Sequence, residues 1–335
     1  MYQLTILHAM LVDSFGRLHN YLRISLTDRC NFRCLYCMPD ESYTFMPAEN
    51  LMSAREIVQL AGIFVKLGVN KIRLTGGEPT IRKDFELILC GLSELNTELL
   101  LTTNGATLHK HISVLKKCGL CSVNVSLDTL DEKRFTNITK RNSFHTVWNN
   151  IMLCLEHDIR VKINVVAIRG CIESELLNFV ALTKNLPIHV RFIEYMPFSG
   201  NQWDKQKVIT AAEMLHRIQS EYDCIKLCDE PHATAKKYKV VGYTGSFAFI
   251  TTMSNAFCNS CNRLRLTADG KIKNCLFGKD EINLLDALRR GEDVAALIQL
   301  SVQKKHAALG GQVHSTYTDI QPENIINRSM ISIGG

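Results

Sequence analysis

Short runs of β-branched and aliphatic residues alternate with amphipathic stretches from about residue 20 to residue 195. Such runs are typical of buried strands, and the stretches between them have the spacing of helices with one apolar face. This alternation predicts a parallel sheet whose strands are joined by right-handed helical crossovers. The strands are predicted at residues 22–26, 71–75, 98–103, 122–127, 161–168 and 189–194.

The clearest helix is predicted between the first two strands. Ser53 and Glu56 fit the S-x-x-E capping box at which many helices begin, and Gly68 is placed to end the helix. The apolar face of this helix consists of Ile57, Leu60, Ala61, Phe64 and Val65. Weaker helical patterns cover residues 84–95, 108–118, 144–157 and 174–184.

The strand–helix units fit either a partial barrel or an open doubly wound sheet, and periodicity does not separate the two. In both folds, ligands bind at the carboxyl ends of the strands. Beyond residue 195 the regular alternation ends, and we expect a helix near 211–221, β-like runs within 238–251 and a helix near 283–299. We therefore divide the chain into a core, residues 1–195, and a C-terminal extension, residues 196–335.

The composition is that of an ordinary globular protein with a sizeable core, because 46% of its 335 residues are hydrophobic and 21% are charged. No apolar run reaches the length of about 18 residues that a membrane helix needs. The apolar start, residues 4–12, follows no Lys or Arg, so we expect neither a secretory signal nor a transit peptide.

The net charge of +6 is a mild excess that solubility alone explains, although an anionic substrate would also fit it. No basic run interleaved with aromatic residues is present, so a nucleic-acid partner is not expected.

Cysteine is frequent, and its pattern changes the picture. Thirteen cysteines cannot all pair, and without an export signal we expect them to be reduced. Seven of them are expected to be core or loop thiols: Cys90, Cys118, Cys121, Cys154, Cys171, Cys224 and Cys228.

The other six cysteines form two trios. Cys30, Cys34 and Cys37 follow the first predicted strand in a C-x3-C-x2-C pattern, and the second trio is Cys258, Cys261 and Cys275. A structural zinc ion takes four ligands and would leave two of the six thiols over. Two cubane iron–sulfur clusters, each with three cysteine ligands and one iron left open, would use all six. The spacing favours iron–sulfur clusters over zinc without deciding between them.

Several motifs carry a resemblance to known proteins. RCNFRCLYCMP resembles the cluster motif of the radical S-adenosylmethionine enzymes, and TGGEP, residues 75–79, resembles their cofactor-contacting turn. From about residue 12 to residue 335, the chain resembles the GTP 3′,8-cyclase family of molybdenum-cofactor biosynthesis (the molybdenum cofactor biosynthesis protein A family). The motifs that carry this resemblance are LRISLTDRCNFRCLYCMP, KIRLTGGEP, LTTNG, VNVSLDTL, VRFIEYMPF, FCNSCNRLRLTADGKIKNCLF and the final Gly-Gly.

The resemblance implies a fold and an activity. The expected fold is α/β, an incomplete (β/α)6 TIM-like barrel with a C-terminal extension that carries a second iron–sulfur cluster. The expected enzyme is a radical S-adenosylmethionine lyase that converts GTP to 3′,8-cyclo-7,8-dihydro-GTP, the first step of molybdopterin synthesis. Its cofactors would be S-adenosyl-L-methionine, bound by one [4Fe-4S] cluster, and a second [4Fe-4S] cluster that offers its open iron to GTP.

The resemblance also implies residue roles. It assigns the first cluster to Cys30, Cys34 and Cys37 and the second to Cys258, Cys261 and Cys275. It places S-adenosylmethionine against Tyr36, Gly77, Glu78, Ser126, Arg191 and Met196. It places GTP against Arg23, Arg73, Thr102, Lys162, Arg263 and Arg265. It gives Arg263, Arg265, Gly334 and Gly335 a part in the radical step.

Two of these assignments have a physical basis in the sequence itself. Arg263 and Arg265 lie two apart in a strand-like run, so they share one face, and guanidinium groups bind phosphate oxygens in pairs. Gly76 and Gly77 would let the backbone approach a ligand closely.

The expected partners follow from the same resemblance. They are GTP, a reductant protein such as flavodoxin or ferredoxin, and cyclic pyranopterin monophosphate synthase as the next enzyme, with no membrane partner. A homodimer is allowed. The location would be the cytoplasm, or the mitochondrial matrix if the source is eukaryotic. The alternatives are a radical enzyme that modifies a peptide or protein and, from another class, a zinc-stapled binding module without catalysis.

Overall fold

A computed structural model describes residues 10–38, 43–313 and 317–335, so most of the apolar start lies outside the described residues. The strands of this part form one sheet in the order β12-β11-β10-β1-β2-β3-β4-β5-β6-β9-β8-β7. Their bounds are β1 Tyr21–Ser25, β2 Lys71–Thr75, β3 Glu98–Thr103, β4 Ser122–Ser126, β5 Arg160–Ala167, β6 His189–Glu194, β7 Cys224–Lys226, β8 Ala235–Val240, β9 Ser246–Ile250, β10 Arg263–Leu266, β11 Lys271–Lys273 and β12 Ile282–Asn283.

The centre of the sheet is parallel and its edges are antiparallel. Strands β1 to β6 pair in sequence order, β10 joins β1, and β9 joins β6, all in parallel. The remaining strands pair antiparallel at the two edges. All six predicted strands are confirmed, each with ends within one residue of the prediction.

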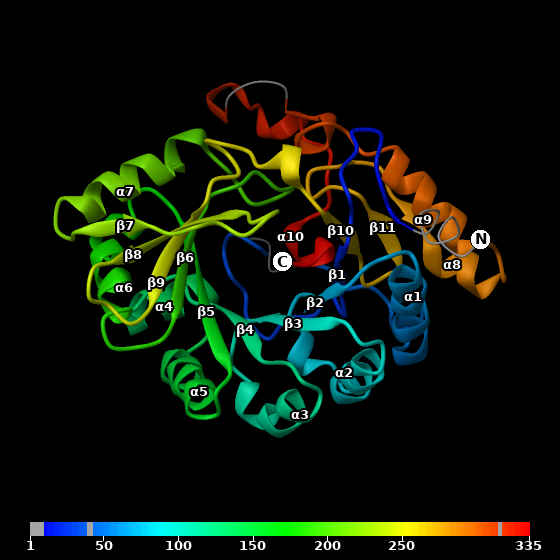
Figure 1. Ribbon diagram of the computed structural model, residues 1–335, viewed down its shortest axis with the longest axis horizontal. Coiled ribbons are helices and arrows are strands. Elements are labelled where there is room, and N and C mark those ends of the chain that lie inside the picture. The colour runs from blue at the N-terminus through cyan, green and yellow to red at the C-terminus, as the bar shows by residue number, and fades with distance from the viewer. Residues whose placement is uncertain (1–9, 39–42, 314–316) are drawn as a thin grey trace.

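Helices cover the outer face of this sheet. In Figure 1, α1, α2, α3 and α5 lie outside the curve of the strands, and α10 lies inside it. None of the helices in the described ranges is long and apolar enough to cross a membrane. The helix bounds are α1 Ala54–Lys66, α2 Phe85–Ser93, α3 Ile112–Lys117, α4 Glu132–Thr139, α5 Phe144–Glu156, α6 Leu176–Leu182, α7 Ala211–Gln219, α8 Leu284–Arg289, α9 Val294–Gln303 and α10 Met330–Ile333.

Helix α1 forms where its capping signals predict it. The Ser53 side chain accepts a hydrogen bond from the Glu56 backbone N–H at 3.3 Å, and the Glu56 carboxylate accepts one from the Ser53 N–H at 2.8 Å. Val65 is only half-buried, so the apolar face is narrower than expected. Its buried members are Ile57, Leu60, Ala61 and Phe64.

One helical prediction was wrong, and one helix was missed. The single helix expected near 283–299 is two helices, because the chain turns at Gly291 with φ 72°. Asp293 begins the second of them by accepting a hydrogen bond from the Ala296 N–H at 3.1 Å. Helix α4 was not predicted, because only Phe135 and Thr139 of it are buried and it has no apolar stripe.

The extension does not form a separate layer. Its strands β8 and β9 continue the sheet beyond β6, and β10, β11 and β12 continue it beyond β1. The division of the chain at residue 195 stays a prediction, but one sheet contains strands from both parts.

Apolar and polar side chains alternate along the strands, so the outer face of the sheet is apolar and the inner face carries polar side chains. On β1, Leu22 and Ile24 are fully buried within the hydrophobic core that also contains Phe64 of α1. Arg23 between them points to the opposite face, because successive side chains of a strand alternate. The inner face of the curve therefore receives the polar side chains of the predicted site.

Candidate functional site

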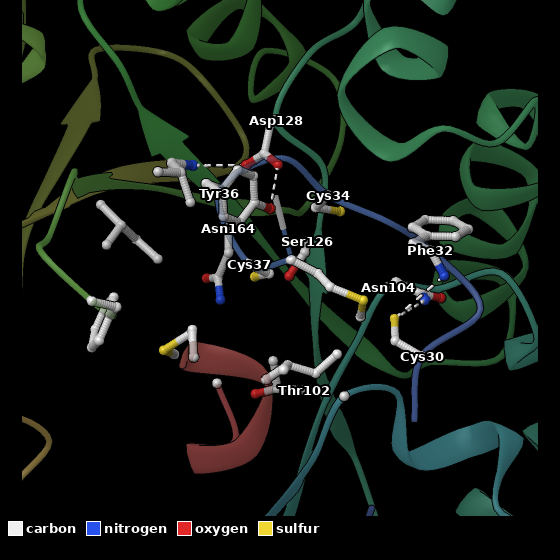
Figure 2. A pocket seen from close by; sticks show the side chains of 18 of the residues that line it. Cys30, Phe32, Cys34, Tyr36, Cys37, Thr102, Asn104, Ser126, Asp128 and Asn164 are labelled. Carbon is white, nitrogen blue, oxygen red and sulfur yellow. Dashed lines mark hydrogen bonds between the residues drawn. The ribbon is translucent and has the colours of Figure 1, made fainter. Parts of the chain in front are cut away.

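The carboxyl ends of the parallel strands border a cavity of about 210 Å3. Figure 2 shows side chains from the loop after β1 and from β3, β4 and β5 around it. The predicted site residues that line it are Cys30, Cys34, Tyr36, Cys37, Gly77, Thr102, Ser126, Met196 and Gly335.

The first cysteine trio lies in the loop that follows β1. The loop is fixed from outside, because the backbone N–H of Arg33 donates to the Thr139 carbonyl at 2.8 Å and that of Leu35 to the Ile138 carbonyl at 3.2 Å. Burial raises the pKa of Cys30 to about 11, and burial together with the charges of Cys37 and Asp128 raises the pKa of Cys34. A positive partner would favour the ionised form of these thiols, which suits a metal cluster.

Tyr36 is held by a carboxylate that the sequence analysis missed. Its hydroxyl donates to Asp128 Oδ2 at 2.6 Å, and Asp128 Oδ1 accepts from the Val166 N–H at 2.8 Å. Burial raises the pKa of Asp128 to about 6, although both hydrogen bonds lower it. Asp128 belongs to the VNVSLDTL motif, where its position directly after the predicted strand 122–127 could have indicated a site residue.

Asn104 was missed in the same way, in the LTTNG motif. Its Nδ2 donates to Asn31 Oδ1 at 2.7 Å and lies 3.8 Å from Cys30 Sγ. It therefore joins the end of β3 to the first trio.

The glycines of the TGGEP turn approach the chain itself. A Cβ on Gly76 would stand 2.7 Å from the Thr27 carbonyl oxygen, and a Cβ on Gly77 would collide with the Arg29 carbonyl. The N–H of Gly77 also donates to the Thr27 carbonyl at 2.6 Å. Both glycines line the cavity, and this backbone contact already requires their small size. The expected close approach of the turn to a ligand stays a prediction.

Glu78 lies behind the cavity wall. Its carboxylate is fully buried and accepts hydrogen bonds from Thr103 Oγ1 at 2.8 Å and from the Asn104 N–H at 2.6 Å, besides Thr80. Burial raises its pKa against the effect of these donors. The structure thus places Glu78 as a support for the end of β3, and its contact with S-adenosylmethionine stays a prediction.

Six cationic side chains of the inner face, here called the cation cluster, lie on β10, β1 and β2, which are neighbours in the sheet, and on the neighbouring pair β5 and β6. Arg23 of β1 is in register with Arg73 of β2 on one side and with Arg265 of β10 on the other. The members are Arg23, Arg73, Lys162, Arg191, Arg263 and Arg265. All six are among the residues predicted for GTP or S-adenosylmethionine.

The members of the cation cluster lie near one another, and none of them forms an ion pair with a carboxylate side chain of the described residues. Burial and the charges of Arg191 and Arg73 lower the pKa of Lys162 to about 8, and burial with Arg73 lowers the pKa of Arg191 to about 9. Three buried donors of the described residues, Arg23 Nε, Arg191 Nε and one terminal nitrogen of Arg263, have no hydrogen-bond partner. Buried unpaired charge is costly, so the cluster is built for a ligand with several negative charges.

The cation cluster is joined to the cavity by three side-chain contacts. Arg73 donates to Thr102 Oγ1 at 3.4 Å, Arg191 donates to Asn164 Oδ1 at 2.5 Å, and Arg23 donates to the Gly335 carbonyl. Thr102, Asn164 and Gly335 all line the cavity. A ligand in the cavity and a polyanion on the cluster would therefore be neighbours.

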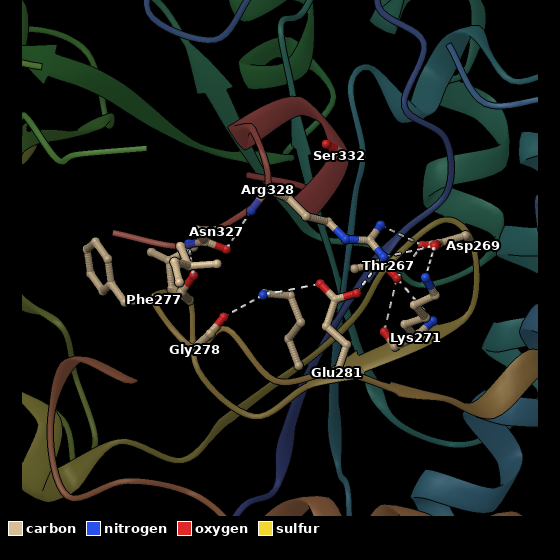
Figure 3. Close-up of polar contacts among 12 residues, drawn as sticks. Thr267, Asp269, Lys271, Phe277, Gly278, Glu281, Asn327, Arg328 and Ser332 are labelled. Atoms are coloured by element: carbon tan, nitrogen blue, oxygen red, sulfur yellow. Dashed lines mark hydrogen bonds and ion pairs between the residues drawn. The ribbon is translucent and has the colours of Figure 1, made fainter. Parts of the chain in front are cut away.

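The C-terminal segment enters this region and is fixed upstream by an ion-pair network (Figure 3). Arg328 donates to Asp269 Oδ1 and Oδ2, both at 2.9 Å, and to Glu281 Oε2 at 2.5 Å. Helix α10 follows, with Ile331 and Ile333 buried, and Met330 and Ile331 line the cavity. The predicted tail residues thus lie between the cavity and the cation cluster.

The second trio lies at the two ends of the β10–β11 hairpin. Cys258 and Cys261 precede β10 and Cys275 follows β11, and each is half-buried. Burial raises the pKa of Cys258, and the nearby Cys275 and Cys261 raise it further. No three His, Cys, Asp or Glu side chains of the described ranges are arranged around a single metal ion. A cubane binds each cysteine through a different iron, so it accepts thiols that stand further apart.

Two of the remaining cysteines contact each other. Cys90 Sγ of α2 and Cys118 Sγ, at the end of α3, are 3.3 Å apart. Cys121 is exposed and lies 3.3 Å from an Arg160 nitrogen, so Cys118 and Cys121 have different neighbours.

Two family models match the chain. The model of the radical SAM superfamily matches residues 24–183, and the model named molybdenum cofactor synthesis C matches residues 188–310. The first range contains the first trio and the second range contains the second.

Individual relatives agree with these models. The chain is 49% identical over 333 residues to the mitochondrial GTP 3′,8-cyclase of Arabidopsis thaliana, covering 97% of this chain and 84% of the relative. It is 47% identical to the molybdenum cofactor biosynthesis protein 1 of Mus musculus, covering 97% of this chain but only 51% of that protein. The crystal structure of Streptococcus suis SuiB bound to its precursor peptide SuiA is 18% identical, with a TM-score of 0.59 over 89% of this chain and 67% of SuiB, and this likeness concerns the fold alone.

Proposed function

Because the chain belongs to the GTP 3′,8-cyclase family of radical S-adenosylmethionine enzymes, we propose that it converts GTP to 3′,8-cyclo-7,8-dihydro-GTP, the first step of molybdenum-cofactor biosynthesis. The observation that carries the proposal is the contact between the cation cluster and the cavity beside the first trio. A triphosphate on the cluster would bring its ribose towards that cavity.

The first trio would hold the [4Fe-4S] cluster of the superfamily, and its three half-buried cysteines all line the cavity, which suits this role. A bound cluster would supply the reducing electron for radical cleavage of S-adenosylmethionine, which is the chemistry that removal of the C3′ hydrogen of GTP requires. The work of the chain itself is to bind and orient both molecules and to exclude water.

The cavity residues have suitable chemistry for S-adenosylmethionine. Tyr36 offers a ring whose hydroxyl is fixed by Asp128, and Ser126 offers a hydroxyl beside it. Met196 adds an adaptable apolar surface, and Gly77 brings the backbone to the cavity wall. Arg191 lies at the border of the cavity and the cation cluster, so its ligand would be either a cofactor carboxylate or a phosphate.

The cation cluster would hold the triphosphate of GTP. Arginine forks bind phosphate oxygens bidentately, and the unpaired donors of Arg23 and Arg263 are the groups that would gain most. We assign Arg23, Arg73, Thr102, Lys162, Arg263 and Arg265 to GTP. The second trio, adjacent to Arg263, would carry the second [4Fe-4S] cluster, which would supply an iron site for GTP.

Further parts of the proposal follow from family membership. The curved sheet would be an incomplete barrel that the extension completes on the substrate side. The electron would come from a flavodoxin or ferredoxin, and the product would pass to cyclic pyranopterin monophosphate synthase. The protein would act as a homodimer, and it would be located in the cytoplasm or in the mitochondrial matrix.

The rival functions lack a comparable site. A peptide-modifying enzyme has no need of a buried cluster of cations, since a peptide is not a polyanion. A zinc-stapled module would not need the cavity beside the first trio. The likeness to SuiB does not favour a peptide substrate, because at 18% identity it concerns the fold alone.

The proposal is tested by incubating the reconstituted protein anaerobically with S-adenosylmethionine, dithionite and GTP, in parallel with ATP as a matched triphosphate. We expect 5′-deoxyadenosine, methionine and the cyclised nucleotide in equal amounts with GTP, and only slow uncoupled cleavage with ATP. Equal deoxyadenosine from both nucleotides, with no cyclised product, would contradict the proposal.

A further inference from the structure

Lys305 is a buried lysine that the function described above does not use. It follows α9 by two residues and is only 4% exposed, whereas its neighbour Lys304 is exposed. Burying an ammonium group is costly unless the group is paired or fully hydrogen-bonded. Its position therefore calls for a counter-charge.

No carboxylate of the described residues pairs with Lys305; its Nζ instead contacts one sulfur of the second trio and two backbone carbonyls close to the trio. The nitrogen lies 3.8 Å from Cys261 Sγ, donates to the Arg263 carbonyl at 3.1 Å and donates to the Asn274 carbonyl. Arg263 follows Cys261 by two residues, and Asn274 directly precedes Cys275. One ammonium group thus joins the two chain segments that carry Cys261 and Cys275.

The residues next to Lys305 bind the third cysteine. The Leu309 N–H donates to Cys258 Sγ at 3.4 Å. Arg17 donates to the Cys258 carbonyl at 2.9 Å and, from the same side chain, to the Ala307 carbonyl at 2.7 Å and the His306 carbonyl at 2.8 Å. The segment 305–309 therefore lies against the trio. Lys305 directs an N–H group at Cys261 Sγ, and Leu309 directs its backbone N–H at Cys258 Sγ.

We propose that Lys305 is a positioning residue of the second trio: its ammonium group holds the Cys261 and Cys275 segments together and supplies the positive charge that the thiolates of a bound cluster require. The inference rests on the proposed second cluster. Hydrogen bonds and positive charge at the sulfur ligands stabilise the reduced, more negative state of an iron–sulfur cluster and so raise its reduction potential. Loss of Lys305 lowers that potential and weakens retention of the cluster.

The test uses the full chain with Cys30, Cys34 and Cys37 all changed to Ala, so that only the second trio can hold iron. Lys305→Met, which keeps the length but not the charge, is compared with Lys305→Arg, which keeps the charge, and with Lys304→Met as the matched surface control. Iron and sulfide per chain are measured after anaerobic reconstitution, and the reduced fraction is measured by electron paramagnetic resonance at fixed poise.

We expect the parent, Lys304→Met and Lys305→Arg to retain a cluster. In Lys305→Met we expect the reduced-to-oxidised ratio to fall at least tenfold, a shift of about 59 mV for a one-electron couple. If Lys305→Met does not fold, Lys305→Gln decides the question, because it keeps a hydrogen-bond donor without the charge.

The outcomes separate the two ideas. A parent that holds no iron contradicts the second cluster of the proposed function. A parent with a cluster whose ratio and iron content are unchanged in Lys305→Met, or in Lys305→Gln, overturns the inference about Lys305 and leaves the cluster standing.

Discussion

The guanidinium of Arg265 donates a hydrogen bond of 2.7 Å to the carbonyl oxygen of Gly334. Arg265 belongs to β10, which pairs with β1, and Arg23 of β1 donates to the next carbonyl, that of Gly335. The final residues of the sequence are thus bound by two members of the cation cluster. A substrate that takes these guanidinium groups must compete with the tail carbonyls or share the donors with them.

Gly334 tests the fit of this tail. Its φ is 87°, and a Cβ would stand 2.8 Å from both Ser25 Cβ and Thr75 Oγ1. A residue with a side chain pays about 1–2 kcal/mol for a backbone with positive φ. The tail of the variant can avoid this strain by moving out of its position. We expect Gly334→Ala to lower the turnover of GTP about tenfold or more while S-adenosylmethionine binding, measured by calorimetry, changes little.

Gly62→Ala is the control. Gly62 lies in α1 and does not line the cavity, and the nearest atom to its added Cβ would be Leu95 Cδ2 at 3.8 Å, an ordinary contact. This variant should retain the activity of the unchanged protein. Equal losses in the two variants would show that the fit of the tail at Gly334 is not the cause.

Arg265 tests the polyanion site. Arg265→Ala removes a buried charge from the cluster, and a charge-assisted hydrogen bond contributes about 1.5–3 kcal/mol. We expect GTP to bind at least about tenfold more weakly and S-adenosylmethionine to bind almost as before. Arg289→Ala, which removes a surface ion pair with Glu56 at 2.7 Å, should alter neither affinity. Equal loss of both ligands in Arg265→Ala would contradict the assignment.

Arg328 tests the anchor of the tail. Its side chain is 21% exposed and its partners Asp269 and Glu281 are 13% and 15% exposed, so the pairs are shielded from solvent. Arg328→Gln should raise hydrogen exchange in residues 329–335 and lower the free energy of unfolding by about 1–3 kcal/mol. Arg290→Gln breaks an ion pair whose partners are 60% and 48% exposed and should change neither quantity. Unchanged exchange in Arg328→Gln would remove Arg328 as the anchor.

The positions of the central strands were predictable, because buried parallel strands consist of nearly continuous apolar runs. The period of two also placed Arg263 and Arg265 on one face, as the buried Leu264 and Leu266 between and beyond them require. The sequence could not show that β10 pairs with β1, because that pairing joins segments more than two hundred residues apart. The register of Arg23 with Arg265 therefore emerged only from the structure.

The missed residues share a second cause. Asp128, Lys305 and Arg328 are ordinary polar residues in the sequence, and each gains its meaning from partners that are distant along the chain. The break between α8 and α9 was missed for a local reason, because helical periodicity continues on both sides of the turn at Gly291.

His19 gives a pH dependence of stability. It is fully buried, and burial, followed by the charge of Lys305, lowers its pKa to about 4. As the pH falls, His19 therefore binds a proton at about pH 6.5 in the unfolded chain but only at about pH 4 in the folded chain. Stability contributed by the neutral ring is complete above pH 6.5 and is lost as the pH falls through this window, by up to about 3 kcal/mol.

His19→Gln should flatten this dependence, because Gln does not titrate and can still donate to Asp13, whose Oδ2 lies 2.9 Å from His19 Nε2. The measurement is the free energy of unfolding between pH 7 and pH 4, with the exposed His157→Gln as control. The same slope in wild type and His19→Gln would show that other groups cause it.

The most direct test of the central claim, that this site brings the ribose of GTP to the cofactor, is to follow a deuterium label placed at C3′ of GTP. The account predicts that mass spectrometry finds the deuterium in 5′-deoxyadenosine and not in the cyclised product. Deuterium retained by the nucleotide, with unlabelled deoxyadenosine, would contradict it.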